Sequence, residues 1–246
     1  MSAALHRRVV LLAGDGQVTA ALEDDFHHFE VSLRHDGMRI TAVDSHSLRT
    51  PWASCSGASV PLQALVGCAL TLRPLAELAH IDAKQQCTHL YDLALMAVAQ
   101  AVRGGRRVYD ARVTDAVDGR QHAVLLRDGQ PCLEWTLEGS TIVAPQRLAG
   151  TSLRTLDMRA IGAGDAELAE ACMLLRRSVM ITGGRGIDFD SYDNIAAFAG
   201  EKGGACHAFQ PRNFALGQRR RGSVREFTGR SELLLAEFEA GTKKEI

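Results

Sequence analysis

The chain has 246 residues, of which 46% are hydrophobic and 23% are charged, and its formal net charge is −1. These values are typical of a globular protein with a buried core, and they exclude a general electrostatic attraction to nucleic acid or to a membrane surface. No stretch approaches the roughly 18 consecutive apolar residues of a transmembrane helix, and the apolar run near the N-terminus is too short for a secretory signal. We therefore expect a cytoplasmic protein whose six cysteines are free thiols or ligands.

The first part of the chain predicts a lead-in followed by a β-hairpin. Residues 1–25 are interpreted as a variable lead-in. Apolar and polar residues alternate over 29–33 and again over 38–44, and Asp36-Gly37 stands between the two segments. Because Asp-Gly favours the tight turns that join antiparallel strands, these residues predict a hairpin.

Three helical segments are expected after the hairpin. Two short ones cover 60–67 and 74–80. The third covers 88–103, and Gly104-Gly105 closes it. Its apolar residues recur at the spacing of a single helical stripe, which predicts an amphipathic helix with one face on a sheet.

The second half of the chain begins with strands. Residues 106–116, 121–129 and 131–145 predict a three-stranded meander. A second long amphipathic helix is expected over 165–182, ending at the glycine-rich segment 183–186.

Together these elements predict an α+β fold. A small antiparallel sheet packs against the long helix, and a β-meander with a second helix extends it. We place the core at 26–104, the extension at 105–230 and a C-terminal tail at 231–246.

The start of the 88–103 helix carries the most reactive set of side chains. Cys87, His89 and Asp92 can each bind a metal or move a proton, and His89 and Asp92 share a helical face. The free N–H groups at a helix start also favour a thiolate at Cys87. A catalytic role for these three residues competes with an interpretation in which Thr88 is the N-cap, Asp92 complements the helix dipole and Cys87 fills space.

Further candidates lie in loops and at a strand entrance. Cys55 stands in a polar, glycine-flanked loop, where ligands and nucleophiles are often found. His27 and His28 enter the first strand of the hairpin, so they point to opposite faces and only one can join a given site. Cys206-His207 lies in a second glycine-rich loop, and the sequence leaves the role of this pair open. It also leaves open whether Cys55, His27 and His28 belong to a site or are only packed or solvated.

No compact motif assigns the chemistry. The sequence contains no Cys-x-x-Cys pair, no His-Glu-x-x-His, no nucleophile elbow, no phosphate loop and no dinucleotide fingerprint. Arg176, Arg177 and Arg185 are candidates to receive the carboxylate or phosphate of a cofactor or substrate.

Three stretches of the first half resemble an uncharacterised bacterial family, DUF 2889. They are HHFEVSLRHDGMRITAV, PWASCSGASVPLQALVG and QCTHLYDLALMAVAQA, and the resemblance spans residues 26–102. A weaker similarity falls at CHAF, residues 206–209. The family name itself implies no activity.

The same region distantly resembles iron–sulfur scaffold proteins of the IscU/NifU type. In those proteins a ligand precedes a strand hairpin, a second cysteine follows the sheet, and a third cysteine opens a long alanine-rich helix. Here His27 or His28, Cys55 and Cys87 stand in that order, so a histidine replaces the first cysteine of the scaffold. The resemblance implies that these residues meet in space with His89 or Asp92 as a fourth group, and it covers nothing in residues 106–246.

These observations favour a metal-binding protein whose cofactor is zinc or an iron–sulfur cluster. The expected ligands are His27 or His28, Cys55, Cys87 and His89. The alternative is a metal- or cysteine-dependent enzyme, a hydrolase or lyase, that acts on a small carboxylate or acyl substrate. A third hypothesis is a non-catalytic binding protein whose cysteines only pack. We expect a small molecule as partner rather than nucleic acid or a membrane, and the sequence leaves the oligomeric state open.

Overall fold

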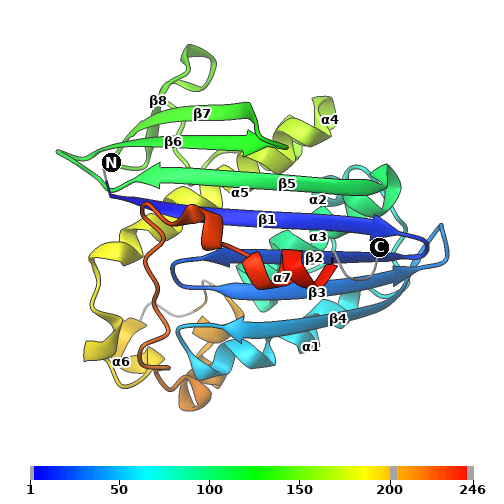
Figure 1. Ribbon diagram of the computed structural model, residues 1–246, viewed down its shortest axis with the longest axis horizontal. Coiled ribbons are helices and arrows are strands. Elements are labelled where there is room, and N and C mark those ends of the chain that lie inside the picture. The colour runs from blue at the N-terminus through cyan, green and yellow to red at the C-terminus, as the bar shows by residue number, and fades with distance from the viewer. Residues whose placement is uncertain (1–2, 200–203, 205, 243–246) are drawn as a thin grey trace.

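The computed structural model describes residues 3–199, 204 and 206–242. Its strands form one antiparallel sheet in the order β4-β3-β2-β1-β5-β6-β7-β8 (Figure 1). The predicted mixed class and the antiparallel sheet are therefore confirmed. The strands are β1 Ala4–Gly14, β2 Gln17–Asp24, β3 His28–His35, β4 Ile40–Arg49, β5 Gly105–Thr114, β6 Arg120–Arg127, β7 Gln130–Glu138 and β8 Thr141–Ala144.

The long helices lie together on one face of this sheet, behind it in Figure 1. Both agree with the predicted ranges to within one residue at each end. In the part of the chain that the structure describes, no helix has the length and apolar character needed to cross a membrane. The helices are α1 Ser59–Leu62, α2 Pro74–Glu77, α3 Thr88–Arg103, α4 Met158–Gly164, α5 Ala166–Thr182, α6 Ile195–Ala199 and α7 Ala236–Thr242.

The segment expected to be a lead-in instead supplies the two strands β1 and β2 at the centre of the sheet. Asp15-Gly16 makes the turn between them, with Gly16 at φ +70°, a conformation that glycine adopts at little cost. The short apolar run near the N-terminus is part of the β1 strand. This difference matters for the site, because β2 ends at Asp24.

The sheet continues without a break across the expected boundary between core and extension. β1 pairs with β5 from Ala4 opposite Thr114 to Ala13 opposite Gly105. Each half of the sheet is a four-stranded meander followed by a long helix. α3 packs on β1, β2 and β3, and α5 packs mainly on β5, β6 and β7.

The α3 helix is buried on all sides rather than on one. Every residue from His89 to Gln100 is buried. The sheet covers one side of the helix, and α1, α2 and α5 contact it from other sides. The residues of the apolar stripe lie in the core, and so do residues between them such as Leu95, Met96 and Gln100.

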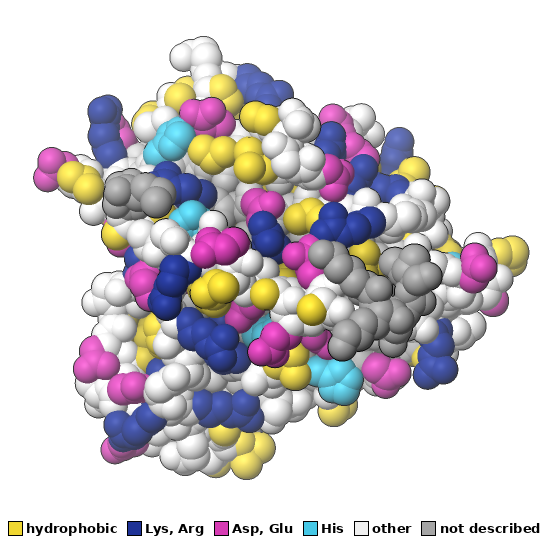
Figure 2. All heavy atoms as spheres, in the orientation of Figure 1, with side chains coloured by type: hydrophobic (Ala, Val, Ile, Leu, Met, Phe, Trp, Pro, Cys, Tyr) yellow, Lys and Arg dark blue, Asp and Glu magenta, His cyan; other side chains and the backbone are white. Residues whose placement is uncertain are grey.

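Two further segments differ from the sequence-based expectation. The stretch 131–145 forms two strands, β7 and β8, because Gly139 (φ +56°) turns the chain between them. The expected tail contains α7, which lies in front of the sheet in Figure 1 and packs through Leu235 on Val10, Ala21 and Val108. Figure 2 shows acidic and basic side chains interspersed over this face, with hydrophobic side chains only in small groups.

The turn between β2 and β3, the start of α3 and the end of α5 meet at one end of the molecule. The ring of Phe26, in that turn, lies against Gly184, where a side-chain Cβ would approach it to 3.1 Å. Asp92 of α3 accepts a hydrogen bond from Arg177 of α5 at 2.8 Å. These contacts bring the candidate ligands of the first half beside residues of the second.

Candidate metal centre

A cavity of about 560 Å³ opens at this end of the molecule. Three thiols and two imidazoles line it, although they come from segments far apart in the chain. Aromatic and aliphatic side chains form most of the remaining wall. Thiolate sulfur and imidazole nitrogen are the ligands that zinc and iron–sulfur clusters prefer. The five lining residues with these groups are His27, Cys55, Cys87, His89 and Cys206.

Cys87 is the N-cap residue of α3, the position expected for Thr88 in the purely structural interpretation. Its backbone is extended (φ −70°, ψ 123°), and no side chain caps the helix. The backbone N–H groups of His89 and Leu90 nevertheless lower the pKa of the Cys87 thiol. These N–H groups carry the positive end of the helix dipole, so the local geometry favours a thiolate.

Cys206 repeats this arrangement in the second half of the chain. Its backbone is extended, and it precedes a 3-10 turn over His207–Phe209. The backbone N–H groups of Ala208 and Phe209 lower the pKa of its thiol, from the same two positions after the cysteine as at Cys87. Cys55 lies within a 3-10 turn over Ala53–Ala58 and is buried.

Burial raises the pKa of all three thiols above the ordinary value. The pKa of Cys87 rises to about 12, because burial and the neighbouring Cys206 outweigh the helix amides. The pKa of Cys55 rises further, through burial and then through the proximity of Cys87 and Cys206. The three thiols therefore stay protonated unless a cation offsets the cost of their charge, and metal binding would release those protons.

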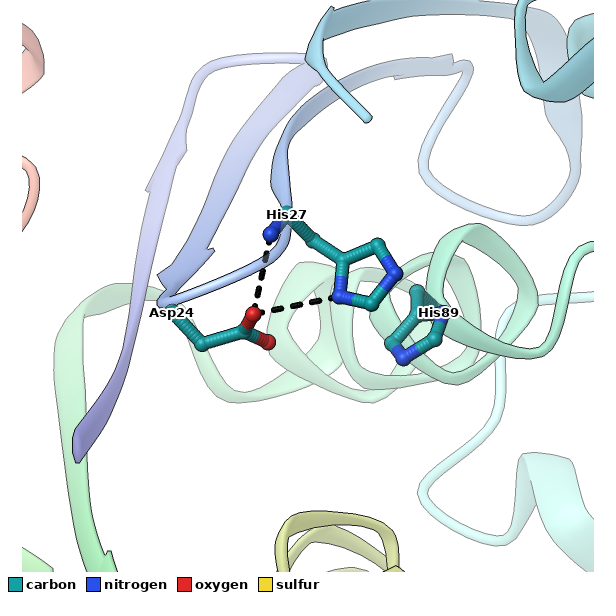
Figure 3. A group of neighbouring side chains, drawn as sticks. All are labelled: Asp24, His27 and His89. Carbon is teal, nitrogen blue, oxygen red and sulfur yellow. Dashed lines mark hydrogen bonds and ion pairs between the residues drawn. The ribbon is translucent and has the colours of Figure 1, made fainter. Parts of the chain in front are cut away.

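Asp24 fixes the ring of His27, as Figure 3 shows. Its Oδ1 accepts the backbone N–H groups of Phe26 and His27 at 2.8 and 2.9 Å and lies 3.1 Å from Nδ1 of His27. Its Oδ2 accepts from Nε of Arg7 at 3.0 Å, and both side chains are fully buried. Burial alone would raise the pKa of Asp24, but Arg7 and then His27 hold it well below its usual range.

An ionised Asp24 can only accept hydrogen bonds, so Nδ1 of His27 donates. The lone pair of His27 is then on Nε2. A carboxylate that orients a histidine in this way is the usual second partner of a metal-binding imidazole. Asp24 therefore suits the role of an orienting group for a ligand at least as well as that of a ligand.

His89 lies face to face with His27. The ring centroids are 3.9 Å apart and the ring planes differ by 27°. Burial, followed by the nearby His27 and Arg7, holds the pKa of His89 well below its ordinary value, so the ring is neutral. Its buried Nε2 has no hydrogen-bond partner among the described residues. An unpaired, neutral nitrogen in a polar cluster is suited to a ligand.

In the described part of the chain, one group of at least three metal-ligating side chains has its ligand atoms all within 4.8 Å of one another, namely Asp24, His27 and His89. Imidazole lone pairs lie in the ring plane, and two stacked rings have no common in-plane point close to both nitrogens. In this arrangement a single ion can therefore bind one of the two histidines but not both.

The other residues predicted at the helix start and strand entrance lie outside the cavity. Asp92 accepts a hydrogen bond from Arg177 and lines a neighbouring cavity, so the structure does not bring it together with Cys87 and His89. His28 lies beside Glu23 and Glu30, at 3.8 and 3.9 Å. As the alternation of a strand requires, His27 and His28 point to different sides.

The arginines separate in the same way. Arg176 lines the neighbouring cavity that contains Asp92. Arg185 is paired with Asp25, Asp115 and Glu226, which leaves its guanidinium surrounded by carboxylates. Of the three arginines considered from the sequence, only Arg177 lines the cavity with the thiols.

Sequence reasoning missed Asp24 and Arg7, and it left Cys206 unassigned. The Arg7–Asp24 pair depends on the register of β1 and β2, where the two residues stand opposite each other. A signal for it existed in Asp15-Gly16, which resembles the hairpin turn at Asp36-Gly37. For Cys206 the signal was its position in a glycine-rich loop next to a histidine, which is weak without the fold.

Residues 12–103 match the model of a family described as a protein of unknown function, DUF2889. Over this part, the chain is similar to the DUF2889 family. No curated protein matches the chain. The similarity to iron–sulfur scaffold proteins stays a prediction.

The DUF2889 segment contains most of the donor atoms of the cavity. His27, Cys55, Cys87 and His89 all lie within residues 12–103. Arg177 and Cys206 lie beyond the segment and reach the same cavity through α5 and the loop after α6. The β1 strand begins before the segment, so the match covers only part of the structural unit that holds the site.

Proposed function

We propose that the protein binds a metal centre in this cavity, with Cys55, Cys87, Cys206 and a histidine, His27 or His89, as ligands. The observation that carries the proposal is the convergence of three buried thiols and two imidazoles on one cavity. The unpaired buried Nε2 of His89 costs free energy in a protein without a ligand. A bound cation would convert that cost into binding free energy.

The backbone around the cysteines supports thiolate ligands in particular. Two backbone N–H groups lower the pKa of each of the thiols of Cys87 and Cys206. Amide dipoles close to a sulfur stabilise its negative charge and tune metal–thiolate centres. The free cysteines also suit the reducing cytoplasm, where we infer that the protein works.

Among the described residues the three cysteines form no tight group, which supports an iron–sulfur cluster over a single zinc ion. The sulfurs of one tetrahedral zinc site lie roughly 3.8 Å apart, given zinc–sulfur bonds of about 2.3 Å. Among the described residues, the three cysteines do not form a group with all ligand atoms within 4.8 Å. In a four-iron cluster each cysteine binds a different iron atom, and in a two-iron cluster the ligands are divided between two iron atoms, so wider spacing is expected.

A cysteine-dependent enzyme is the weaker of the two candidate functions. Burial raises the pKa of Cys87 to about 12, so the free thiol lacks the activation that a nucleophile needs. Asp92, the expected third member, is engaged by Arg177 instead. A metal-dependent reaction remains compatible with the cavity, since a metal could activate water or polarise a carbonyl there.

The test is the metal content of Cys87→Ser protein purified without air. Serine keeps nearly the same volume and can cap a helix, so the variant should fold with a loss on the order of 1 kcal/mol or less. The hydroxyl is a far poorer ligand than a thiolate. We expect wild-type protein to contain iron and sulfide and to absorb visible light, and Cys87→Ser to lose most of both.

The matched control is Cys172→Ser. Cys172 is buried in the core on α5 and does not line the cavity. Its substitution should lower stability, because it buries a hydroxyl, but should leave the metal content per folded molecule unchanged. Zinc without colour would select the zinc form of the proposal. Equal metal content in folded wild type and Cys87→Ser would refute it.

A further inference from the structure

The cavity has a preformed aromatic wall. Trp52, Phe189, Phe198 and Phe209 form a connected cluster with neighbouring ring centroids between 5.3 and 6.2 Å apart. Their tilted and edge-to-face arrangements are the favourable geometries for aromatic pairs. A wall fixed in this way is ready to receive a flat apolar surface.

Arg219 secures this wall. Its guanidinium carbon lies 5.8 and 5.7 Å from the ring centroids of Trp52 and Phe189, within the range of cation–π contacts. The same guanidinium donates to the carbonyl of Pro51 and to the hydroxyl of Ser223, both at 2.7 Å. The aromatic side chains are therefore held in place without a ligand.

The size of the cavity and its exposed rim indicate an organic ligand beside the metal. Its volume of about 560 Å³ is within the range of small-molecule sites, roughly 300–1,000 Å³. Met180 and Ile187 line it and keep 52% and 38% of their surface exposed. Large apolar side chains exposed at a concave site are typical of a surface that a ligand covers.

Arg177 gives the cavity a positive charge with unused hydrogen-bond donors. Asp92 accepts from Nε of Arg177 at 2.8 Å, and no described residue accepts from its two terminal amino groups. No carboxylate side chain of the described residues lines the cavity. A planar guanidinium fixed at one nitrogen and open at the other two is suited to a carboxylate.

We propose that this cavity binds a small carboxylic acid with a flat, apolar body, the carboxylate on Arg177 and the body against the aromatic wall. As the assignment of a substrate class, this inference rests on the proposed metal centre beside it. Binding of the acid itself depends on other side chains, so the two proposals can fail separately.

The experiment titrates the full-length protein, as purified and after metal removal, with 2-naphthoate and with uncharged 2-naphthamide, followed by calorimetry. We expect saturable binding of one naphthoate per chain in both preparations. The amide should bind at least about tenfold more weakly, because it lacks the charge-assisted hydrogen bonds. Naphthoate binding no tighter than naphthamide binding in wild type would overturn the inference.

Three variants locate the carboxylate. Arg177→Gln should reduce naphthoate affinity to that of the amide, and Arg177→Lys should restore part of it. Arg176→Gln is the matched control, because Arg176 is the neighbouring residue on α5 and lines a different cavity. An equal effect of Arg177→Gln and Arg176→Gln in folded protein would overturn the assignment.

Met180→Glu tests the same point if Arg177→Gln does not fold. Met180 is half exposed and lies one helical turn from Arg177, where a glutamate can occupy the guanidinium. It should weaken naphthoate binding more than naphthamide binding, and equal weakening would contradict the inference. Metal bound without naphthoate would refute only the organic ligand. Naphthoate binding to wild-type protein that contains no metal as purified would refute the metal centre and support the acid site. Naphthoate binding to metal-free Cys87→Ser would support the acid site alone.

Discussion

Asp24 connects the core of the protein to the candidate metal centre. One of its oxygens accepts from the turn that carries His27 and lies beside the imidazole, and the other accepts from Arg7. Both Asp24 and Arg7 are fully buried. The position of the His27 ring therefore depends on the buried Arg7–Asp24 ion pair, and breaking this pair would cost free energy of folding.

Asp24→Asn should be strongly destabilising. The amide keeps the shape of the carboxylate, but it leaves the charge of Arg7 buried without a counter-charge. Removing one partner of a buried pair typically costs about 3–5 kcal/mol. Chemical denaturation would measure the change in the free energy of unfolding.

Glu138→Gln is the control for Asp24→Asn. Glu138 pairs with Arg120 across neighbouring strands, but the side chains are 51% and 67% exposed. A pair so exposed should contribute less than about 1 kcal/mol. A similar decrease in the free energy of unfolding of the two variants would show that the buried pair stabilises the protein no more than the exposed pair does.

Among the elements, the segment from α6 to residue 219 carries Cys206 and two rings of the aromatic wall, Phe198 and Phe209. Ile195, at the start of α6, is fully buried in a cluster with Trp52, Cys55 and Ala208. Its backbone N–H donates to the carbonyl of Gly217 at 2.8 Å. This close approach fixes the loop that brings Cys206 to Cys55 and Cys87.

Gly217→Ala should loosen this segment. A Cβ at this position would lie 2.9 Å from Cβ of Ile195, which cannot move away as the end of a flexible side chain could. The backbone φ of −85° is open to any residue, so the cost is steric and should be on the order of 1–3 kcal/mol. Thermal unfolding would measure the loss.

Gly186→Ala provides the comparison. No atom lies within 4 Å of a Cβ built at Gly186. This variant should unfold at nearly the wild-type temperature. If Gly217→Ala were as stable as Gly186→Ala, residue 217 could move away from Ile195 at little cost, which would contradict this prediction.

At the scale of the whole molecule, the two halves form one sheet and one cavity. The DUF2889 segment carries His27, Cys55, Cys87 and His89, while Arg177 and Cys206 come from the second half. The pairing of β1 with β5 and the antiparallel contact of α3 with α5 hold these groups together. A site built in this way requires the whole chain.

The sequence predicted those features that depend on neighbouring residues. The 88–103 and 165–182 helices follow from apolar periodicity, and the β3–β4 hairpin follows from Asp36-Gly37. The order of motifs grouped His27 or His28 with Cys55 and Cys87, and of these four residues His27, Cys55 and Cys87 line one cavity. In each case the signal lies within a few residues or within one known order of motifs.

The remaining features depend on contacts between distant segments. The Arg7–Asp24 pair exists only in the register of β1 on β2, and the Arg177–Asp92 pair only once α5 packs beside α3. Cys206 reaches Cys87 across more than a hundred residues. No local pattern encodes such distances, so the sequence could not rank Cys206 above the other cysteines.

The most direct test of the account is the metal content of Cys206→Ser, purified without air beside wild type and Cys132→Ser. Cys132 lies on β7, outside the cavity, and serves as the control. If the site is assembled from both halves, folded Cys206→Ser should lose most of its metal, while Cys132→Ser keeps the wild-type amount. Full metal content in folded Cys206→Ser would contradict the claim that these three cysteines share one centre.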